Sequence, residues 1–376
     1  MAEQAALLEV PFVDLAGLHA GLKEDILAAL GDLIDRSEFA TGAAVRQFEE
    51  AFARSCAASE CVGVSSGIDA LRLLLEAAGV APGDEVIVPA MTFIATFAAV
   101  SQVGATPVPA DISGDDYTVD PSAAEAAIGS RTRWLVPVHL YGQLADMRGI
   151  RAIADRHGLG VVEDACQAHG AARARVAPGH GTVGAAFSFY PGKNLGAMGD
   201  AGAVVTDDAA IADRVRLLRV HGQRGKYRHE RIGWTARMDA FQAAVLTCKL
   251  GRLAEWNAER RAVAELYAEL LAGVGDLALP KVAPASEHVW HLYVVRTHDP
   301  AALADHLRAR AIATGRHYPT PPHLTEAYAH LGYAAGTFPV AEELARTGLS
   351  LPIFPGMAQA QVEAVAAAVE EYFRHS

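Results

Sequence analysis

The chain has 376 residues and a formal net charge of −12 at pH 7, and hydrophobic residues make up 51% of it. That length allows a large core and more than one domain, while an acidic chain without a polybasic run is poorly suited to bind nucleic acid or an anionic membrane. No apolar run is long enough to cross a membrane, and the first residues lack a signal-peptide pattern, so we expect a cytoplasmic protein. The four cysteines are scattered without a CxxC pair, which favours neither a metal site nor a disulfide framework.

The first candidate for chemistry is a turn between a strand and a helix. A buried strand over 61–65 runs into Ser66-Gly67 and then into a helix that Gly79 ends. Free backbone N–H groups and the helix dipole both point at such a turn, so it can bind an anion. A phosphate is the natural occupant, and an ordinary strand-to-helix turn is the alternative.

Strands and helices then alternate along the chain. Strands are predicted over 85–89, 106–109, 135–141 and 160–164, and helices over 91–103 and 150–157. This alternation predicts right-handed βαβ units and a mostly parallel sheet, in which ligands bind at the carboxyl ends of the strands. Asp164 closes an apolar strand at such an end, so we expect its carboxylate to have a cationic partner. A helix N-cap is the alternative role.

The rest of the chain is organised around the stretch over 185–206. It predicts a buried strand over 185–190, a Pro-Gly turn and a second apolar strand over 202–206. The turn presents Lys193, one of only five lysines in the chain. A desolvated lysine has a depressed pKa and can attack a carbonyl, including the aldehyde of pyridoxal phosphate, as a neutral amine. The alternative is a solvated, inert lysine at a hairpin turn.

Two further stretches need an interpretation. The segment 179–184 matches the dinucleotide-binding pattern GxGxxG, but it precedes a strand instead of following one, and no helix starts at its end, so we reject that function. The basic stretch 221–229 could neutralise an anionic substrate or an adjoining subunit, and a solvated surface loop is the alternative.

The pattern changes in the last third of the chain. Short strands are predicted over 291–296 and 314–318, and helices over 301–309 and 359–373, with many prolines between them. This composition predicts a second, smaller α+β domain.

Three of these features are parts that a pyridoxal-phosphate enzyme requires. The turn at Gly67 would hold the phosphate, Asp164 would keep the pyridine nitrogen protonated, and Lys193 would hold the aldehyde. Their order along the chain matches fold type I enzymes.

Along nearly its full length the chain resembles the DegT/DnrJ/EryC1/StrS family of pyridoxal-phosphate-dependent sugar aminotransferases. The motifs that carry the resemblance lie at 65–71, 89–93, 163–171, 187–194 and 237–239. The resemblance implies an α/β fold of type I. Residues 1–252 would form a large domain with a mostly parallel central sheet flanked by helices, and 253–376 a smaller C-terminal α+β domain.

The resemblance also implies a site. Lys193 would form a Schiff base with pyridoxal 5′-phosphate and move the proton between substrate and cofactor, while Asp164 would pair with the pyridinium. The other implied cofactor contacts are Gln167 to the ring hydroxyl, Phe93 to the ring face, and the backbone of Gly67 and Ile68 with the Ser188 hydroxyl to the phosphate. Implied substrate contacts are His317, Tyr318 and His323. No metal is expected.

Two positions depart from the family's pattern. Ile68 stands where relatives commonly carry a polar residue, and Thr235 stands where they usually have an asparagine that reaches the phosphate across the dimer interface. We expect both departures to affect the affinity for the cofactor and not the chemistry, because Lys193 and Asp164 are intact. A site that draws on two chains implies a homodimer.

The implied reaction is ping-pong transamination. An amino acid, by resemblance L-glutamate, would convert the cofactor to pyridoxamine phosphate, which would then aminate a nucleotide-linked ketosugar in deoxyaminosugar biosynthesis for a natural product or glycan. We expect the amino group at carbon 4 in preference to carbon 3.

Two alternatives remain open. One is a non-transaminating, dehydratase-like enzyme, although a histidine replaces the lysine in known dehydratase relatives and Lys193 is present here. The other is a pyridoxal-phosphate-binding regulatory protein on the same scaffold, against which the acidic charge and the absence of a DNA-reading motif count.

Overall fold

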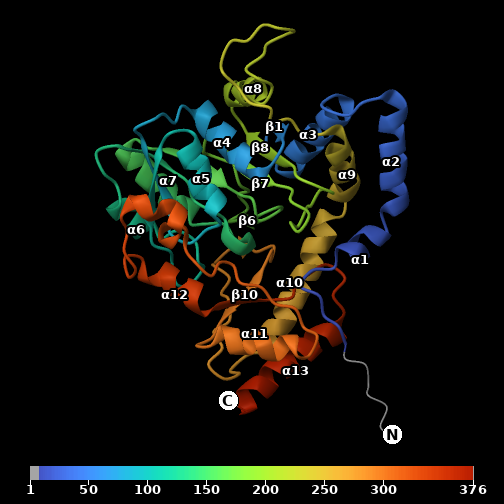
Figure 1. The fold of residues 1–376 in the computed structure, drawn as a ribbon, viewed down its shortest axis with the longest axis vertical. Helices are drawn as coiled ribbons and strands as arrows, with labels where there is room; N and C mark the ends of the chain where they lie inside the picture. Colours follow the sequence, from blue (N-terminus) through green and yellow to red (C-terminus); the bar gives the residue numbers. More distant parts are fainter. Residues whose placement is uncertain (1–7, 376) are drawn as a thin grey trace.

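A seven-stranded sheet lies at the centre of the computed structural model, which describes residues 8–375 (Figure 1). Its strand order is β1-β8-β7-β5-β4-β2-β3. The strands are β1 (Glu60–Val64), β2 (Glu85–Pro89), β3 (Thr106–Ala110), β4 (Thr132–Leu135), β5 (Gly160–Asp164), β7 (Gly184–Ser188) and β8 (Gly202–Thr206). Only β8 runs antiparallel to its neighbours within this sheet, which confirms the predicted mostly parallel arrangement.

Helices cover both faces of the sheet, and alternate strand residues point to the two helical layers. One face packs against α4 (Gly67–Ala78), α5 (Ile94–Gln102) and α8 (Ala209–Leu218). The other packs against α3 (Ala43–Ser55), α6 (Pro121–Ala126), α7 (Met147–His157) and α9 (Ala240–Leu250). Since both faces are buried, most strand residues are apolar, and a charged residue inside a strand needs hydrogen-bond partners.

The C-terminal part has a core of its own below this sheet (Figure 1). It contains α10 (Leu253–Leu270), α11 (Pro300–Arg308), α12 (Pro339–Thr347), α13 (Gln359–His375) and the antiparallel strands β10 (Tyr293–Arg296) and β11 (Gly348–Leu351). A second antiparallel pair joins β6 (Ala172–Arg173) to β9 (Ser286–Glu287). A boundary at residue 252 stays a prediction.

The N-terminal segment connects both parts. Val10 pairs with Ile312 and lies in the C-terminal core. The chain then forms α1 (Leu15–Ala20) and α2 (Lys23–Arg36), and side chains from this region pack against α9 and the start of α10. Within residues 8–375, no helix has both the length and the apolar character that a membrane span requires.

Two predicted strands differ from the structure. The strand predicted over 135–141 ends at Leu135, because Pro137 has no N–H to extend the ladder and residues 140–142 form a 3-10 turn. The strand predicted over 314–318 is reduced to a single bridge between Gly315 and Ser350, and β11 takes the place beside β10.

Candidate active site

A cavity of about 600 Å³ lies where the carboxyl ends of several strands meet the C-terminal part of the chain. Most of the predicted site residues line this one cavity. They are Gly67, Ile68, Phe93, Asp164, Gln167, Ser188, Lys193, His317 and Tyr318. Segments that are more than two hundred residues apart in the sequence therefore converge here.

The N-terminus of α4 forms one wall. The Ser66 hydroxyl accepts a hydrogen bond from the Asp69 N–H at 3.2 Å and so caps the helix. Gly67 and Ile68 line the cavity and belong to the first turn of α4, where the main-chain N–H groups have no acceptor within the helix. A Cβ at Gly67 would lie 2.5 Å from the Ser188 Cβ, so only glycine allows this close approach. The resulting cradle of main-chain N–H groups and one hydroxyl suits a phosphate.

Asp164 is held at the end of β5 by both carboxylate oxygens. Oδ2 accepts a hydrogen bond from Thr96 Oγ1 at 2.8 Å, and Oδ1 accepts one from the Cys166 N–H at 3.1 Å. The Thr96 hydroxyl is in turn hydrogen-bonded to the Thr92 hydroxyl, with 2.8 Å between the two oxygens. The second contact closes a turn over 164–166, and no helix begins there, so it is not the helix N-cap considered as the alternative. No cationic side chain of the described residues forms an ion pair with Asp164, although its charge acts on nearby Lys193.

Gln167, which follows β5, and Tyr318, from the C-terminal part of the chain, connect the two parts at the site. Gln167 Oε1 accepts a hydrogen bond from the Tyr141 N–H at 2.7 Å, and Gln167 Nε2 donates to Tyr318 Oη at 3.1 Å. The ring of Phe93 lies 5.4 Å from that of Tyr318, centroid to centroid. Phe93 is 51% exposed despite its size, so its ring is available to a ligand in the cavity.

Lys193 is presented by the predicted Pro-Gly turn, whose closing hydrogen bond runs from the Lys193 N–H to the Tyr190 carbonyl at 2.8 Å. Lys193 is partly buried and lines the cavity, and burial lowers the pKa of its amine against the opposing effects of Cys166 and Asp164, which favours a reactive lysine over a solvated hairpin lysine. Burial, helped by Lys193, also lowers the pKa of His317 to about 4. That imidazole is therefore neutral at neutral pH, and its Nδ1 lies 2.8 Å from Ser350 Oγ.

Two predicted residues lie outside the cavity. Thr235 is exposed, and its hydroxyl lies 3.0 Å from His221 Nε2. His323 is buried, with Nε2 3.3 Å from Glu342 Oε1 and its ring edge against Phe338. The roles proposed for these two residues stay predictions.

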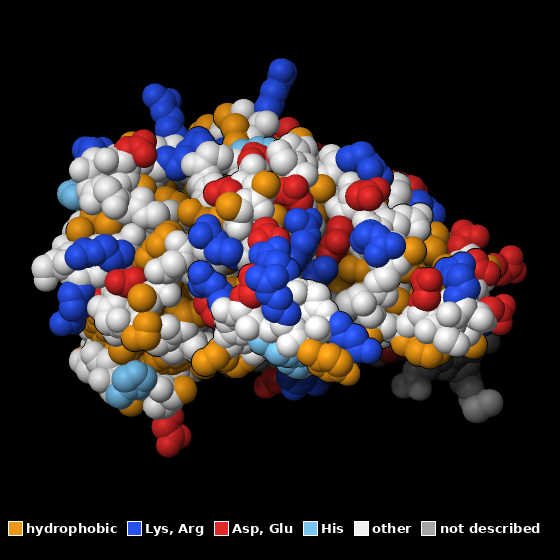
Figure 2. Space-filling model, turned by 90° about the horizontal axis from the view of Figure 1, so that it is seen from above, with side chains coloured by type: hydrophobic (Ala, Val, Ile, Leu, Met, Phe, Trp, Pro, Cys, Tyr) orange, Lys and Arg blue, Asp and Glu red, His pale blue; other side chains and the backbone are white. Residues whose placement is uncertain are grey.

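The basic stretch is part of an exposed loop that stands beyond α8 (Figure 1). Figure 2 looks onto this end of the molecule and shows Lys and Arg side chains gathered near the middle of the face. Arg224 forms ion pairs with Asp213 and Glu230, and Arg228 pairs with Glu230. Part of the positive charge is thus balanced within the loop's own surroundings.

Sequence reasoning missed several residues that complete the cavity. Thr96 holds Asp164 from α5, Cys166 lies beside Lys193, and Arg260 reaches the cavity from α10. Thr92 and Thr96 share one side of a helix start, at a spacing of four, which was the available signal. Nothing in the local sequence distinguishes Arg260 from the other arginine of α10, Arg261.

The residues present fit pyridoxal phosphate. The cradle at Gly67 can take the phosphate, a desolvated amine is available at Lys193, and the carboxylate of Asp164 is oriented by two donors without a protein cation. Phe93 supplies a flat apolar surface in the same cavity.

The fold and this cavity define a fold type I pyridoxal-phosphate-dependent aminotransferase. The structure of DesV from S. venezuelae, solved with a ketimine intermediate, superposes with a TM-score of 0.95 at 49% identity, over 97% of this chain and 98% of that one. The chain belongs to the DegT/DnrJ/EryC1/StrS aminotransferase family, whose model matches residues 21–370.

Two relatives show how similar the whole chain is to named members. A dTDP-3-amino-3,4,6-trideoxy-α-D-glucose transaminase of Streptomyces venezuelae is 48% identical over 99% of this chain and 98% of its own length. The erythromycin biosynthesis sensory transduction protein EryC1 of Saccharopolyspora erythraea is 49% identical over 96% and 99%.

Proposed function

We propose that this aminotransferase moves the amino group of an amino acid, L-glutamate, to carbon 3 of a nucleotide-linked ketosugar. The observation that carries the proposal is the meeting of Lys193, Asp164 and the Gly67 cradle in one cavity of about 600 Å³. Support for the sugar comes from the S. venezuelae relative, whose name places an amino group on carbon 3 of a dTDP-linked sugar. For that reason we replace the carbon 4 expected from the sequence by carbon 3.

Pyridoxal phosphate, when bound, supplies an aldehyde that carries the amino group and a ring that accepts electrons from the reacting carbon. The chain's own residues bind and orient it. Lys193 offers an amine whose lowered pKa increases its neutral, nucleophilic fraction, and the same amine can then move a proton beside the reacting carbon. The carboxylate of Asp164, which two hydrogen-bond donors hold at the cavity wall, would pair with the ring nitrogen and so keep a proton on it.

The remaining contacts set the orientation of the ring. Main-chain N–H groups at Gly67 and Ile68, with the Ser188 hydroxyl, would anchor the phosphate. Gln167 would donate to the ring hydroxyl, and Phe93 would cover one face. His317 and Tyr318 border the same cavity and are proposed to contact the substrate.

A homodimer is part of the proposal. Tyr227 is 80% exposed and Ile232 is 90% exposed, both in the loop that also carries Thr235. Burial of such side chains is favourable, and exposed apolar groups gathered on one loop are typical of a protein interface. We propose that this loop packs against a second copy and brings Thr235 to the phosphate end of the partner's cavity.

The first experiment is the visible absorption spectrum of the purified protein with added pyridoxal phosphate, before and after L-glutamate, beside Lys193→Ala. We expect a lysine-linked band in the wild type that L-glutamate converts to the pyridoxamine phosphate spectrum, and no such band in the variant. A wild-type protein that never shows the band would refute the cofactor's role.

The second half of the reaction identifies the sugar. The pyridoxamine phosphate form is mixed with dTDP-linked 3-ketosugars and 4-ketosugars in turn, and the return of the lysine-linked band is followed. Return with a 3-ketosugar alone is expected. A faster return with the 4-ketosugar would reverse the choice of carbon.

A regulatory role is the second candidate, because one relative of 49% identity is named a sensory transduction protein. A gel-shift experiment at moderate salt tests it directly. DNA binding that pyridoxal phosphate alters would support regulation, and no shift would leave catalysis as the function.

A further inference from the structure

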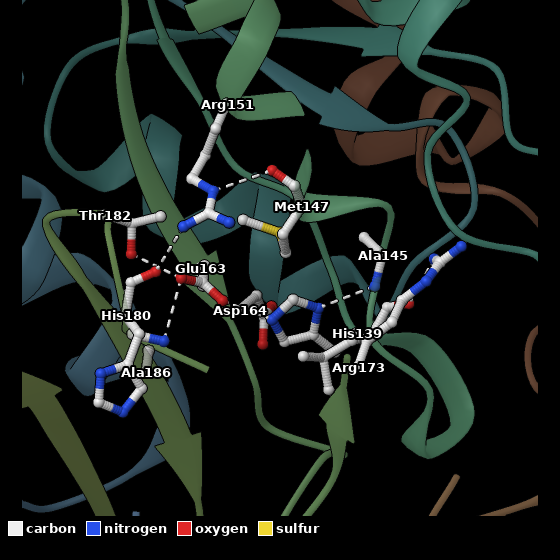
Figure 3. Close-up of polar contacts among 12 residues, drawn as sticks. His139, Ala145, Met147, Arg151, Glu163, Asp164, Arg173, His180, Thr182 and Ala186 are labelled. Atoms are coloured by element: carbon white, nitrogen blue, oxygen red, sulfur yellow. Dashed lines mark hydrogen bonds and ion pairs between the residues drawn. The ribbon is translucent and has the colours of Figure 1, made fainter. Parts of the chain in front are cut away.

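A buried polar network lies behind Asp164, on the opposite face of β5 (Figure 3). Its centre is Glu163, the residue before Asp164, and neighbouring residues of a strand point to opposite faces of the sheet. Glu163 is 1% exposed and is absent from the cavity lining that Asp164 helps to form. A carboxylate buried this deeply is costly unless it is fully hydrogen-bonded.

Three donors satisfy Glu163. His139 Nε2 lies 2.8 Å from Oε2, while Oε1 accepts hydrogen bonds from Thr182 Oγ1 at 2.5 Å and from the Gly179 N–H at 3.0 Å. His139 Nδ1 accepts from the Ala145 N–H at 3.2 Å, so the proton of this imidazole is on Nε2 and points at the carboxylate. Thr182 and His139 approach Glu163 from opposite sides (Figure 3).

The donors come from the two segments that flank β5 at its carboxyl end. On one side, the Asp164 N–H donates to the Pro137 carbonyl and the His139 N–H donates to the Asp164 carbonyl, both at 3.0 Å. On the other side, β7 pairs with β5 through Asp164 and Ala186. The turn that supplies Gly179 and Thr182 leads directly into β7, and β7 leads to the Lys193 turn.

The Glu163 side chain therefore ties together the segment that pairs with Asp164 and the segment that presents Lys193. Gly179 and Thr182 of the GxGxxG segment serve Glu163. Gly179 and Gly181 have φ of +92° and +70°, a backbone conformation that favours glycine, so the pattern has a structural explanation. If the role of Glu163 were purely structural, its hydrogen bonds would contribute only to stability, and apolar side chains could fill the same space.

We propose that Glu163 is a positioning residue, whose hydrogen bonds to His139 and to the 179–182 turn fix Asp164 relative to Lys193. This inference rests on the proposed function, in which both residues hold the same cofactor. Asp164 would orient the ring through its nitrogen, and Lys193 would hold the aldehyde group. A small shift between the two residues would weaken cofactor binding and change the environment of the lysine linkage.

The test is Glu163→Gln in the full-length protein. The amide has nearly the same size, but its NH₂ faces a donor, so one hydrogen bond to the network is lost. We measure the Kd of pyridoxal phosphate and the pH midpoint of the visible band, both well below the melting temperature. We expect the Kd to rise about tenfold, a typical effect of disrupting one buried hydrogen bond to a charged group, and the midpoint to move.

Two further variants make the test decisive. Thr182→Val keeps the shape and removes one donor, so a smaller change in the same direction is expected even if Glu163→Gln folds poorly. Asp276→Asn is a control for a hydrogen-bonded carboxylate outside the cavity, because Asp276 accepts hydrogen bonds from Thr297 Oγ1 at 2.6 Å and the His298 N–H at 2.9 Å, lies 2.6 Å from His298 Nδ1 and does not line the cavity. We expect its Kd and midpoint to equal those of the wild type.

The outcomes separate this inference from the proposed function. If Glu163→Gln and Thr182→Val melt at lower temperature but keep the wild-type Kd and midpoint, Glu163 is only a structural staple and the inference is wrong. The same follows if Asp276→Asn changes both quantities as strongly. If the wild type shows no lysine-linked band at all, the proposed function fails first and the inference fails with it.

Discussion

Two lysines in this protein are desolvated, and the comparison between them shows what makes one of them chemically useful. Lys193 lines a cavity with Asp164 and Cys166 beside it. Lys249, on α9, is 0% exposed, donates a hydrogen bond to the Gly196 carbonyl and lies 3.1 Å from His19 Nε2. Burial lowers the pKa of both amines, in the case of Lys249 to about 8.

A lowered pKa is thus not enough to identify a reactive lysine. The amine of Lys249 is enclosed by protein groups, and no part of it can meet a ligand. Its hydrogen bond nevertheless reaches the end of the turn that begins at Pro191 and presents Lys193. One lysine provides the chemistry, and the other supports the turn that holds it.

The largest effect should come from Lys193→Ala. Without the amine, the cofactor has no covalent link to the chain and no group beside the reacting carbon to move the proton, so we expect the rate to fall about 1000-fold or more. Single-turnover kinetics with L-glutamate measure this. Lys249→Met is the matched control and should keep both the visible band and most of the activity, and loss of the band in that variant would break the distinction between the two lysines.

Asp164→Asn should have the next largest effect. The amide keeps the size of the side chain but cannot hold a proton on the ring nitrogen, so we expect the half-reaction with L-glutamate to slow by about 100-fold. Thr96→Val removes one hydrogen bond to Asp164 and leaves the charge, and a smaller loss is expected there. Equal rates for Asp164→Asn and the wild type would mean that the carboxylate does not act on the cofactor.

Lys249→Met should reduce stability instead of chemistry. The substitution fills the space but leaves the Gly196 carbonyl without its donor, and an unpaired buried acceptor costs about 1–3 kcal/mol. Denaturant unfolding of the full-length protein gives the value. A variant as stable as the wild type would show that the hydrogen bond only offsets the cost of burying the amine.

Much of the fold was predictable because its signals are local. β2, β5 and β8 have the bounds that their apolar runs and flanking turns predicted, and Gly79 ends α4 in the left-handed conformation that glycine adopts easily. The strand predicted over 314–318 failed because its pairing depended on β11, which lies more than thirty residues later in the chain.

The same reasoning explains which site residues were found. Gly67, Asp164 and Lys193 each follow a recognisable strand or turn, so their neighbours in the sequence identify them. Thr96 and Lys249 act through contacts with partners 68 and 53 residues away, and no local pattern records such a contact. Glu163 is part of the recognised motif at 163–171, but the sequence alone does not show that His139 and Thr182 hydrogen-bond to it.

The last expected effect is a pH dependence of stability that belongs to Lys249. Burial lowers its pKa in the folded protein from 10.5 to about 8, while the unfolded chain keeps the ordinary value. Between these pH values the unfolded state binds more protons than the folded state, so the free energy of unfolding should rise with pH from about 8 toward 10.5. Below pH 8 both states are protonated and this contribution is constant. Denaturant unfolding of the wild type and Lys249→Met across this range isolates the effect, since every other titrating group is shared. The wild type should gain stability over the variant as the pH rises, and a constant difference would mean that Lys249 keeps its proton when buried, through its bond to the Gly196 carbonyl.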